Sequence, residues 1–252
     1  LGHKQRPKIP DRMMLLLQCG LGLLCIALVA RLLMKCFMAE VYDGVIIRMT
    51  ARWYKAVLTR LGHKQRLLDI GIGTATALAR NAHHVLEKQL TVVGIDYEEA
   101  YVRKAAQVVR DAGLNEAVVL HCKSIYDPQL PMLFSGAAKF DAVYFSGSLT
   151  LMPDPGAALR AAASMLNDKG LIYVTQTFQN QPSPITAMVK PLLRALTTID
   201  FGVVTYKADM DAIIESSGLS LLEDSPIPGS INTTAQTARM YVLEFRSDQR
   251  RC

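Results

Sequence analysis

The segment Leu67-Leu68-Asp69-Ile70-Gly71-Ile72-Gly73-Thr74-Ala75 decides the fold class. Its first four residues are mostly apolar and typical of a buried strand. Glycines at 71 and 73 then permit a tight turn and a close approach of a bound molecule to the backbone. A helical stretch, 76–86, follows and would present unpaired N–H groups at its N-terminus. The segment therefore predicts a strand, a binding loop and a helix in succession.

Strands and helices alternate along the rest of the chain. The predicted strands are 67–70, 90–95, 117–121, 141–145, 170–177, 219–223 and 240–245. The predicted helices among them are 76–86, 98–112, 156–166 and 208–217, the last ended by Gly218. This alternation is typical of a parallel sheet with crossover helices. We therefore predict an α/β fold with a doubly wound, mostly parallel sheet.

The composition excludes several classes of protein. The chain of 252 residues is 50% hydrophobic, with 16 Gly and 11 Pro, which excludes disordered, collagen-like and low-complexity chains. Five cysteines without a C-x-x-C pair predict neither a disulfide framework nor a metal site. Residues 1–66 hold 12 Lys and Arg against three acids, whereas residues 67–252 hold 16 against 19. The larger part is therefore not expected to bind nucleic acid.

Residues 13–30 read MMLLLQCGLGLLCIALVA, with Gln18 as the only strongly polar side chain. Basic residues flank this run on both sides, and a helix from Met13 to Met38 is long enough to cross a bilayer. We predict a transmembrane anchor helix over 13–38 that contacts the lipid bilayer. A secretory signal peptide and a buried core helix are the alternatives. Because both flanks are basic, the positive-inside rule gives only a weak preference for orientation.

Residues 39–66 are predicted to form an amphipathic linker or lid helix. One helical face of its central part is apolar and another is basic; the members are Ile46, Met49, Trp53 and Val57 on the first, and Arg48, Arg52 and Lys55 on the second. Such a helix either lies on a membrane surface, with Trp53 at the headgroups, or packs its apolar face on the following domain. We favour packing on the domain.

The basic N-terminal segment, residues 1–12, contains an oddity. LGHKQR at 1–6 recurs at 61–66, but the match is too short for a structural repeat. Met13 and Met14 directly precede the apolar run. One interpretation is that the natural chain starts at Met13 and that residues 1–12 are an artefact.

Two residues, Asp69 and Ala75, distinguish the glycine loop from a nicotinamide-binding loop. Asp69 stands two residues before the first glycine, where an apolar residue is usual, and suits a cationic or amino-bearing group. Ala75 replaces the third glycine. Asp96, at the end of the next strand, is placed to accept hydrogen bonds from two ribose hydroxyls. Capping of the helix 98–112 is the alternative role for Asp96.

Four motifs follow one another in a familiar order: LLDIGIGTATAL, VVGIDYEEAYVRKA, FDAVYFSGSLTLMPDP and LNDKGLIYVTQTF. In order and spacing they resemble class I S-adenosylmethionine-dependent methyltransferases over about residues 40–246. The resemblance implies a seven-stranded Rossmann-like sheet, a methyltransferase domain at 67–252 and S-adenosyl-L-methionine as cofactor. The layout is similar to small-molecule, quinone-type methyltransferases and to membrane-anchored thiol methyltransferases.

The resemblance also implies cofactor contacts near the first two strands. Asp69 would lie near the methionine amino group, and Gly71 and Gly73 would let the loop pass under the cofactor. Asp96 would bind the ribose, and Tyr97 would contact the adenine face.

Further contacts are implied elsewhere in the chain. Ser124 stands where the family usually has an Asp facing the adenine amino group, with Ile125 beside the ring. Ser146 and Gly147 match the position facing the methyl group, and Tyr42 resembles a tyrosine that closes over the cofactor. A turn role for Ser124 and an interface role for Tyr42 are the alternatives.

No catalytic residue is assigned. No His follows His121, and the candidate bases are Asp200, Tyr206 and Asp209. In-line positioning can suffice for a thiol or an acidic phenol. FSGSLT replaces the N-P-P-Y motif that holds planar amines, and no paired catalytic Cys suggests a 5-methylcytosine enzyme.

We predict a membrane-anchored S-adenosylmethionine-dependent methyltransferase of a small lipophilic acceptor, methylated at O, S or C. The expected location is the mitochondrial inner membrane or the endoplasmic reticulum, with the domain facing matrix or cytosol. The first alternative is a non-catalytic or weakly active accessory or assembly subunit that binds the subunits of a membrane complex. The second is a soluble nicotinamide oxidoreductase, disfavoured by Asp69 and Ala75.

Overall fold

A computed structural model describes residues 29, 44, 46–134, 139–181 and 205–245. The predicted anchor (apart from Val29), Tyr42 and the candidate base Asp200 lie outside the described residues. Across the described ranges, no helix combines the length and the apolar character that crossing a bilayer requires. The described residues from 46 onward belong to one compact unit.

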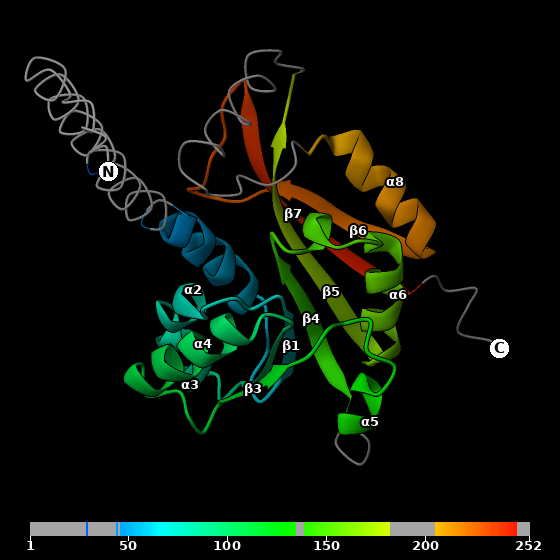
Figure 1. The fold of residues 1–252 in the computed structure, drawn as a ribbon. Coiled ribbons are helices and arrows are strands. Elements are labelled where there is room, and N and C mark those ends of the chain that lie inside the picture. The colour runs from blue at the N-terminus through cyan, green and yellow to red at the C-terminus, as the bar shows by residue number, and fades with distance from the viewer. Residues whose placement is uncertain (1–28, 30–43, 45, 135–138, 182–204, 246–252) are drawn as a thin grey trace, which may run out of the picture. The chain divides into compact units, whose positions relative to one another are not determined.

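Seven strands form one sheet (Figure 1). They are β1 (Arg66–Ile70), β2 (Thr91–Asp96), β3 (Val118–Cys122), β4 (Phe140–Ser146), β5 (Leu166–Gln179), β6 (Leu219–Pro226) and β7 (Gln236–Phe245). Their order is β3-β2-β1-β4-β5-β7-β6, and β7 runs antiparallel to both of its neighbours. The pairings of β1 to β5 are parallel. The predicted seven-stranded, mostly parallel α/β sheet is therefore confirmed.

The helices mostly follow the predicted ranges. They are an N-terminal helix over residues 46–58, α2 (Thr76–Ala79), α3 (Ala82–Glu87), α4 (Glu99–Asp111), α5 (Leu130–Leu133), the 3-10 turn η1 (Leu149–Leu151), α6 (Pro155–Ser164) and α8 (Lys207–Ser217). The prediction of one continuous helix over 76–86 was wrong, because α2 ends at Ala79 and α3 begins at Ala82. Asn81, between them, donates from Nδ2 to the carbonyl oxygens of Ala77 and Ala51, both at 2.9 Å.

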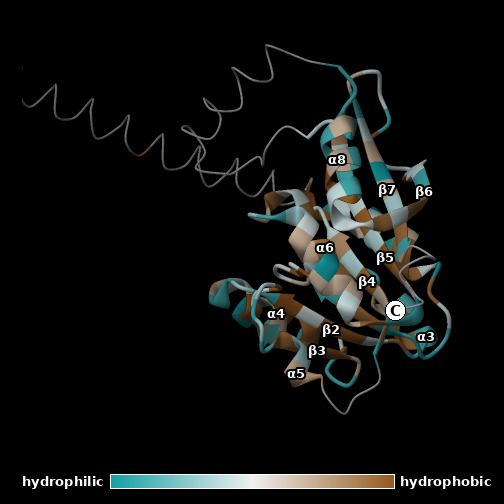
Figure 2. Cartoon of the chain, turned by 90° about the vertical axis from the view of Figure 1, so that its right-hand side faces the viewer, coloured by the Kyte–Doolittle hydropathy of each residue, from teal (hydrophilic) through white to brown (hydrophobic). Residues whose placement is uncertain are grey.

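The sheet lies between two layers of helices. Neighbouring residues of a strand point to opposite faces, so Leu67 belongs to one hydrophobic core and Leu68 to the other. The N-terminal helix and α2 to α4 cover the face of Leu67, whereas α5, α6 and α8 cover the face of Leu68. Hydrophobic colouring accordingly runs along the strands between the helices (Figure 2). Both faces of the parallel strands are thus buried, as such sheets require.

The N-terminal helix belongs to this domain. Trp53, Tyr54, Val57 and Leu58 are each 3% exposed or less and share a core with β1 and β4. Trp53 donates from its indole Nε1 to Ser230 Oγ at 3.0 Å. The structure therefore confirms packing on the domain and places Trp53 inside the protein rather than at lipid headgroups.

Lys88 closes the C-terminal end of this helix. Its Nζ donates to the carbonyl oxygens of Leu58 (2.9 Å), Thr59 (2.8 Å) and Leu61 (2.6 Å). The last carbonyls of a helix lack partners within it and carry partial negative charge. One ammonium group therefore satisfies the carbonyl of Leu58, the last helical residue, and the two carbonyls of Thr59 and Leu61 just after it. It also connects the N-terminal helix to the end of α3.

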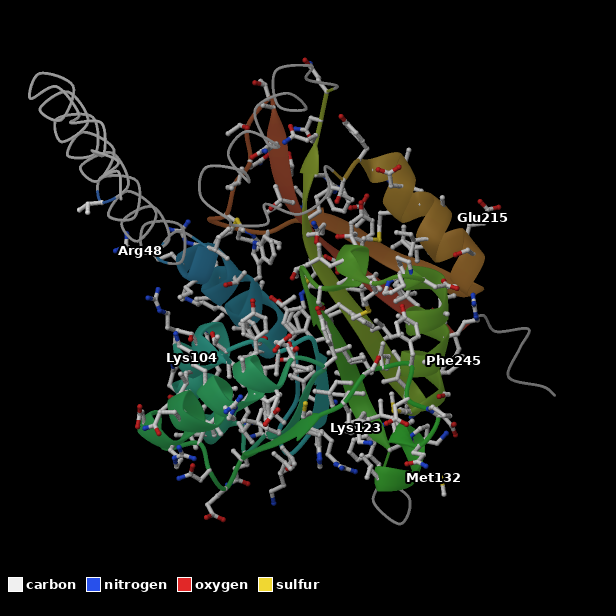
Figure 3. The ribbon with its side chains drawn as sticks, viewed as in Figure 1. Arg48, Lys104, Lys123, Met132, Glu215 and Phe245 are labelled. Carbon is white, nitrogen blue, oxygen red and sulfur yellow. The ribbon has the colours of Figure 1, made fainter. Side chains whose placement is uncertain are left out.

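We expect Lys88→Met to lower the free energy of unfolding by about 1–2 kcal/mol, because it removes charge-assisted hydrogen bonds but keeps the aliphatic stem. Urea unfolding measures the change. Lys104→Met is the matched control, since Lys104 is exposed on α4 and bonds to no other described residue (Figure 3). It should change stability by less than about 0.5 kcal/mol. Equal losses in both variants would contradict the role of Lys88.

Candidate cofactor site

The loop after β1 needs its two glycines for different reasons. Gly71 has φ +75°, and a Cβ there would lie 2.6 Å from Cβ of Ser148, whose hydroxyl donates to the Ile70 carbonyl at 2.5 Å. Gly73 has φ +57°, but a Cβ there would meet no described atom within 4 Å. Ala75 also has positive φ, at 56°. Packing excludes a side chain at Gly71, whereas Gly73 borders open space.

Asp69, near the end of β1, is fully buried. Its Oδ2 accepts a hydrogen bond from the Tyr54 hydroxyl at 2.7 Å, and its Oδ1 has no partner among the described residues. Burial is the main cause that raises the pKa of Asp69, to about 7; the Tyr54 hydrogen bond opposes this rise, and the negative charge of Asp96 contributes to it. A buried carboxylate oxygen without a donor suits a positively charged amino group.

Asp96, the last residue of β2, ties the loop to the neighbouring strand. Its Oδ2 accepts from the backbone N–H of Gly73 at 3.0 Å, and its Oδ1 accepts from that of Glu98 at 2.9 Å. The N-cap residue of α4 is Glu98, so Asp96 is not the helix cap. A carboxylate oxygen accepts more than one hydrogen bond, so both remain able to receive a ribose hydroxyl.

The three predicted adenine contacts have different surroundings. Tyr97 follows β2 and is 79% exposed. Ser124 follows β3, and its Oγ accepts from the backbone N–H of Tyr126 at 3.2 Å, which is the turn role. Ile125 is buried in the core on the α5 and α6 side. The backbone N–H of Lys123 donates to the Asp96 carbonyl at 2.9 Å. The residues that follow β2 and those that follow β3 therefore meet at the carboxyl edge of these two strands.

A second set of polar groups lies at the ends of β4 and β5. The Oγ of Ser146 and the Oε1 of Gln176 are buried and have no hydrogen-bond partner within the described part of the chain. A Cβ on Gly147 would lie 3.3 Å from Cζ3 of Trp53 and 3.7 Å from Oε1 of Gln176. Ser146, Gln176 and Asp69 together supply three of the six buried side-chain atoms that lack a hydrogen-bond partner among the described residues. Sequence reasoning missed Gln176, although a polar residue near the end of a buried strand is a signal.

Of the candidate bases, Asp209 has a structural role. Its Oδ2 accepts a hydrogen bond from the backbone N–H of Tyr206, the N-cap residue of α8, at 2.9 Å. Tyr206 lies beside the end of β5, where it forms a bridge with Gln179. No catalytic residue is assigned from the described residues.

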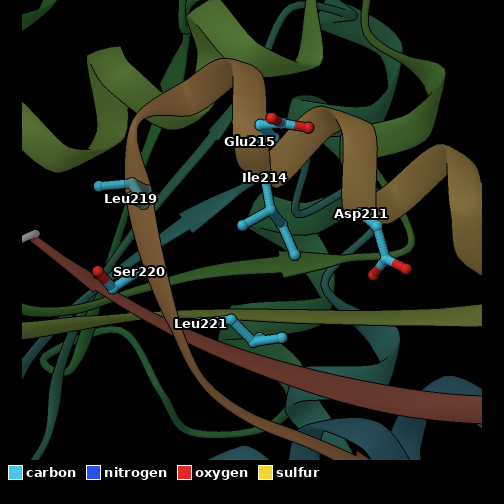
Figure 4. Close-up of a pocket in the computed structure, with 6 residues that line it drawn as sticks. All are labelled: Asp211, Ile214, Glu215, Leu219, Ser220 and Leu221. Atoms are coloured by element: carbon cyan, nitrogen blue, oxygen red, sulfur yellow. The ribbon is translucent and has the colours of Figure 1, made fainter.

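A groove of about 420 Å³ lies between α8 and β6 (Figure 4). Its lining residues are Asp211, Ile214, Glu215, Leu219, Ser220 and Leu221. β6 is an outer strand, separated from β1 by β4, β5 and β7. The groove is therefore distinct from the glycine loop and forms no part of the candidate cofactor site.

This strand order, a glycine loop after β1, and acids at the ends of β1 and β2 define a class I S-adenosylmethionine-dependent methyltransferase. Residues 61–218 match the family model described as "Methyltransferase domain". The chain therefore belongs to this methyltransferase family, and its cofactor is S-adenosyl-L-methionine.

Two relatives of known name share sequence with this chain. A phosphatidylethanolamine N-methyltransferase of Cereibacter sphaeroides is 24% identical over 173 residues, which cover 67% of this chain and 77% of the relative. A ubiquinone biosynthesis O-methyltransferase of Bordetella avium is 23% identical over 194 residues, covering 72% and 75%.

Solved structures confirm the fold. The cyclase SpnF superposes with a TM-score of 0.60 at 18% identity, over 77% of this chain and 81% of that protein. A methyltransferase of Geobacter sulfurreducens, solved in complex with S-adenosyl-L-homocysteine, gives a TM-score of 0.54 at 14% identity, over 78% and 90%.

We expect Gly73→Val to weaken binding of S-adenosyl-L-homocysteine at least 100-fold, because the side chain would enter the open space over the loop. Its positive φ should lower stability by about 1–2 kcal/mol. Calorimetric titration measures binding, and urea unfolding measures stability.

Gly113→Val is the matched control. Gly113, after α4, has φ +68° and similarly open surroundings but lies outside the loop. It should show a similar loss of stability with unchanged binding. Equal binding by both variants would exclude the space over Gly73 as the path of the cofactor.

Proposed function

We propose that this chain is a membrane-anchored methyltransferase that transfers the methyl group of S-adenosyl-L-methionine to a small lipophilic acceptor. The observation that carries the transfer is the Gly71–Gly73 loop, bordered by two buried acids with one carboxylate oxygen unpartnered among the described residues. The apolar run at residues 13–30 supports the anchor.

The acceptor class is supported by the two relatives. Their names refer to phosphatidylethanolamine and to ubiquinone biosynthesis, and both molecules dissolve in bilayers rather than in water. An enzyme held at the bilayer surface meets such acceptors at a high local concentration.

The proposed roles are divided among residues at the carboxyl ends of the strands. S-adenosyl-L-methionine, when bound, supplies an electrophilic methyl group on a sulfonium. Asp69 holds the amino end of the cofactor, and Asp96 holds the ribose. Ser146 and Gln176 lie toward the acceptor, where the Gln176 amide oxygen accepts a hydrogen bond and orients the nucleophile. An acidic thiol or phenol ionises without a dedicated base.

The direct test incubates the full chain in detergent with methyl-labelled S-adenosyl-L-methionine and one of two acceptors. These are vesicles that contain phosphatidylethanolamine and vesicles that contain a polyprenyl catechol. We expect label in the lipid extract with at least one of them. Binding of S-adenosyl-L-homocysteine without transfer to either lipid would favour the accessory-subunit alternative, and absence of binding would overturn the cofactor assignment.

We expect Asp96→Ala to weaken cofactor binding by about 1.5–3 kcal/mol, the scale of hydrogen bonds to a charged acceptor. The change also releases the N–H groups of Gly73 and Glu98 that the carboxylate holds. Calorimetric titration with S-adenosyl-L-homocysteine measures the loss. Asp111→Ala, at the end of α4, is the control and should bind as the unchanged chain does. Unchanged affinity in Asp96→Ala would remove Asp96 from the site.

The anchor is proposed to be separable from the chemistry. A chain that begins at Ala39 keeps the N-terminal helix and should retain affinity for S-adenosyl-L-homocysteine. It should lose more activity on bilayer-dissolved acceptors than on water-soluble analogues, because the anchor acts through local concentration. Parallel assays with vesicles and with a short-chain analogue measure the ratio of the activities on the two kinds of acceptor. Equal losses on both acceptors would contradict this role.

We further propose that the anchor lies in the mitochondrial inner membrane or the endoplasmic reticulum. The domain then faces the matrix or the cytosol, where the cofactor is present. Protease protection in fractionated cells tests the orientation, and a domain facing the endoplasmic reticulum lumen would contradict it.

A further inference from the structure

The contact between Tyr54 and Asp69 joins the N-terminal helix to the loop-bearing strand. Tyr54 is 2% exposed, and its hydroxyl makes the 2.7 Å hydrogen bond to Oδ2 of Asp69. Its ring meets that of Tyr144 edge-on, with centroids 4.9 Å apart. The Tyr144 hydroxyl, in turn, is 2.9 Å from Oγ1 of Thr175. Buried polar groups thus connect the helix with β1, β4 and β5.

The helix holds Tyr54 firmly. Beyond the Lys88 ammonium at its end, Arg52 donates to the Gly229 carbonyl at 2.6 Å, and Asn81 donates to the Ala51 carbonyl. Arg60, just past the helix, makes two hydrogen bonds to Glu223, at 2.5 and 2.8 Å. These bonds fix the helix against the domain, and burial of the Tyr54 side chain keeps its hydroxyl beside Asp69.

The surroundings of Asp69 contain no described positive charge. The titratable groups that face it are Tyr54 from the N-terminal helix, Tyr144 from β4 and Asp96 from β2. Two are neutral hydroxyls and the third is an acid. The single described hydrogen bond to the Asp69 carboxylate comes from Tyr54, which opposes the rise in pKa caused by burial.

We propose that Tyr54 is a positioning residue that holds the Asp69 carboxylate ready for the ammonium group of the cofactor, so that binding releases a proton and depends on the N-terminal helix. This inference rests on the assignment of Asp69 to the amino end of the cofactor. The balance is simple: Asp69 loses its carboxyl proton to solvent, and the carboxylate pairs with the incoming ammonium.

The pH dependence has a definite sign. With the pKa of Asp69 at about 7 in the free protein, the carboxyl is mostly protonated at pH 6 and mostly ionised at pH 8. An ammonium group favours the ionised form, so affinity should rise with pH and level off above about 7. Binding at pH 6 should be about tenfold weaker than at pH 8.

The test is calorimetric titration of the full chain in detergent with S-adenosyl-L-homocysteine between pH 6 and 8.5. Repeating it in buffers of different ionisation enthalpy counts the protons released. At pH 7 we expect about half a proton per molecule bound, because the carboxyl is then about half ionised.

Three variants test whether the released proton comes from Asp69. Tyr54→Phe removes the hydrogen bond that lowers the pKa of Asp69, so the midpoint should move to higher pH and binding at pH 7 should weaken three- to tenfold. Asp69→Asn should keep only the pH dependence that the ligand itself contributes. Tyr173→Phe is the matched control: this buried tyrosine of β5 lies near Arg60 and Glu223, and its loss should leave the pH profile unchanged.

The outcomes separate this inference from the proposed function. Absence of proton release by the unchanged chain, which needs no variant to fold, would overturn the inference. So would a Tyr54→Phe profile that matches the unchanged chain. If the unchanged chain binds no S-adenosyl-L-homocysteine at any pH, the cofactor site itself is wrongly assigned.

Discussion

The rest of the site depends on a carboxylate buried at the end of a central strand without a described cation beside it. Removing an ionised group from water is costly unless something compensates. Asp69 has one hydrogen bond from Tyr54 and one oxygen without a described partner. The fold therefore keeps an uncompensated buried carboxylate in the place where we propose that the amino group of the cofactor binds. A preformed site for a cation needs such a group, since full compensation by the protein would leave no driving force for the ligand.

The same constraint makes the N-terminal helix part of the working domain. The matched family region begins at residue 61, yet Trp53 of this helix lies beside Gly147, just after β4, and Tyr54 bonds to Asp69 near the end of β1. These neighbours in sequence reach two strands because β1 and β4 pair directly. The helix over residues 46–58 therefore borders the site and contributes to the core of the domain.

Much of this could be predicted from the sequence, for physical reasons. The strand–loop–helix pattern, Asp69 and Asp96 follow from local spacing, which a parallel sheet translates directly into position at one edge. The break at Asn81 could not be predicted, because its side chain bonds to Ala51, distant in the sequence. Neither could the partner of Asp69, which depends on the helix rotation that points Tyr54 inward. Gln176 was missed because only the folded sheet shows that its amide oxygen is buried.

The reversed strand β7 has a practical consequence for handling the protein. Pairing Gln236 with Gln179 and Leu243 with Ile172 brings Phe245 to the edge of the sheet where β1 and β4 begin, opposite the glycine loop (Figure 3). A dye or an immobilisation linker attached at that point would leave the cofactor edge open to solution. Surface-based binding measurements can thus orient every molecule alike, with the binding edge turned away from the support.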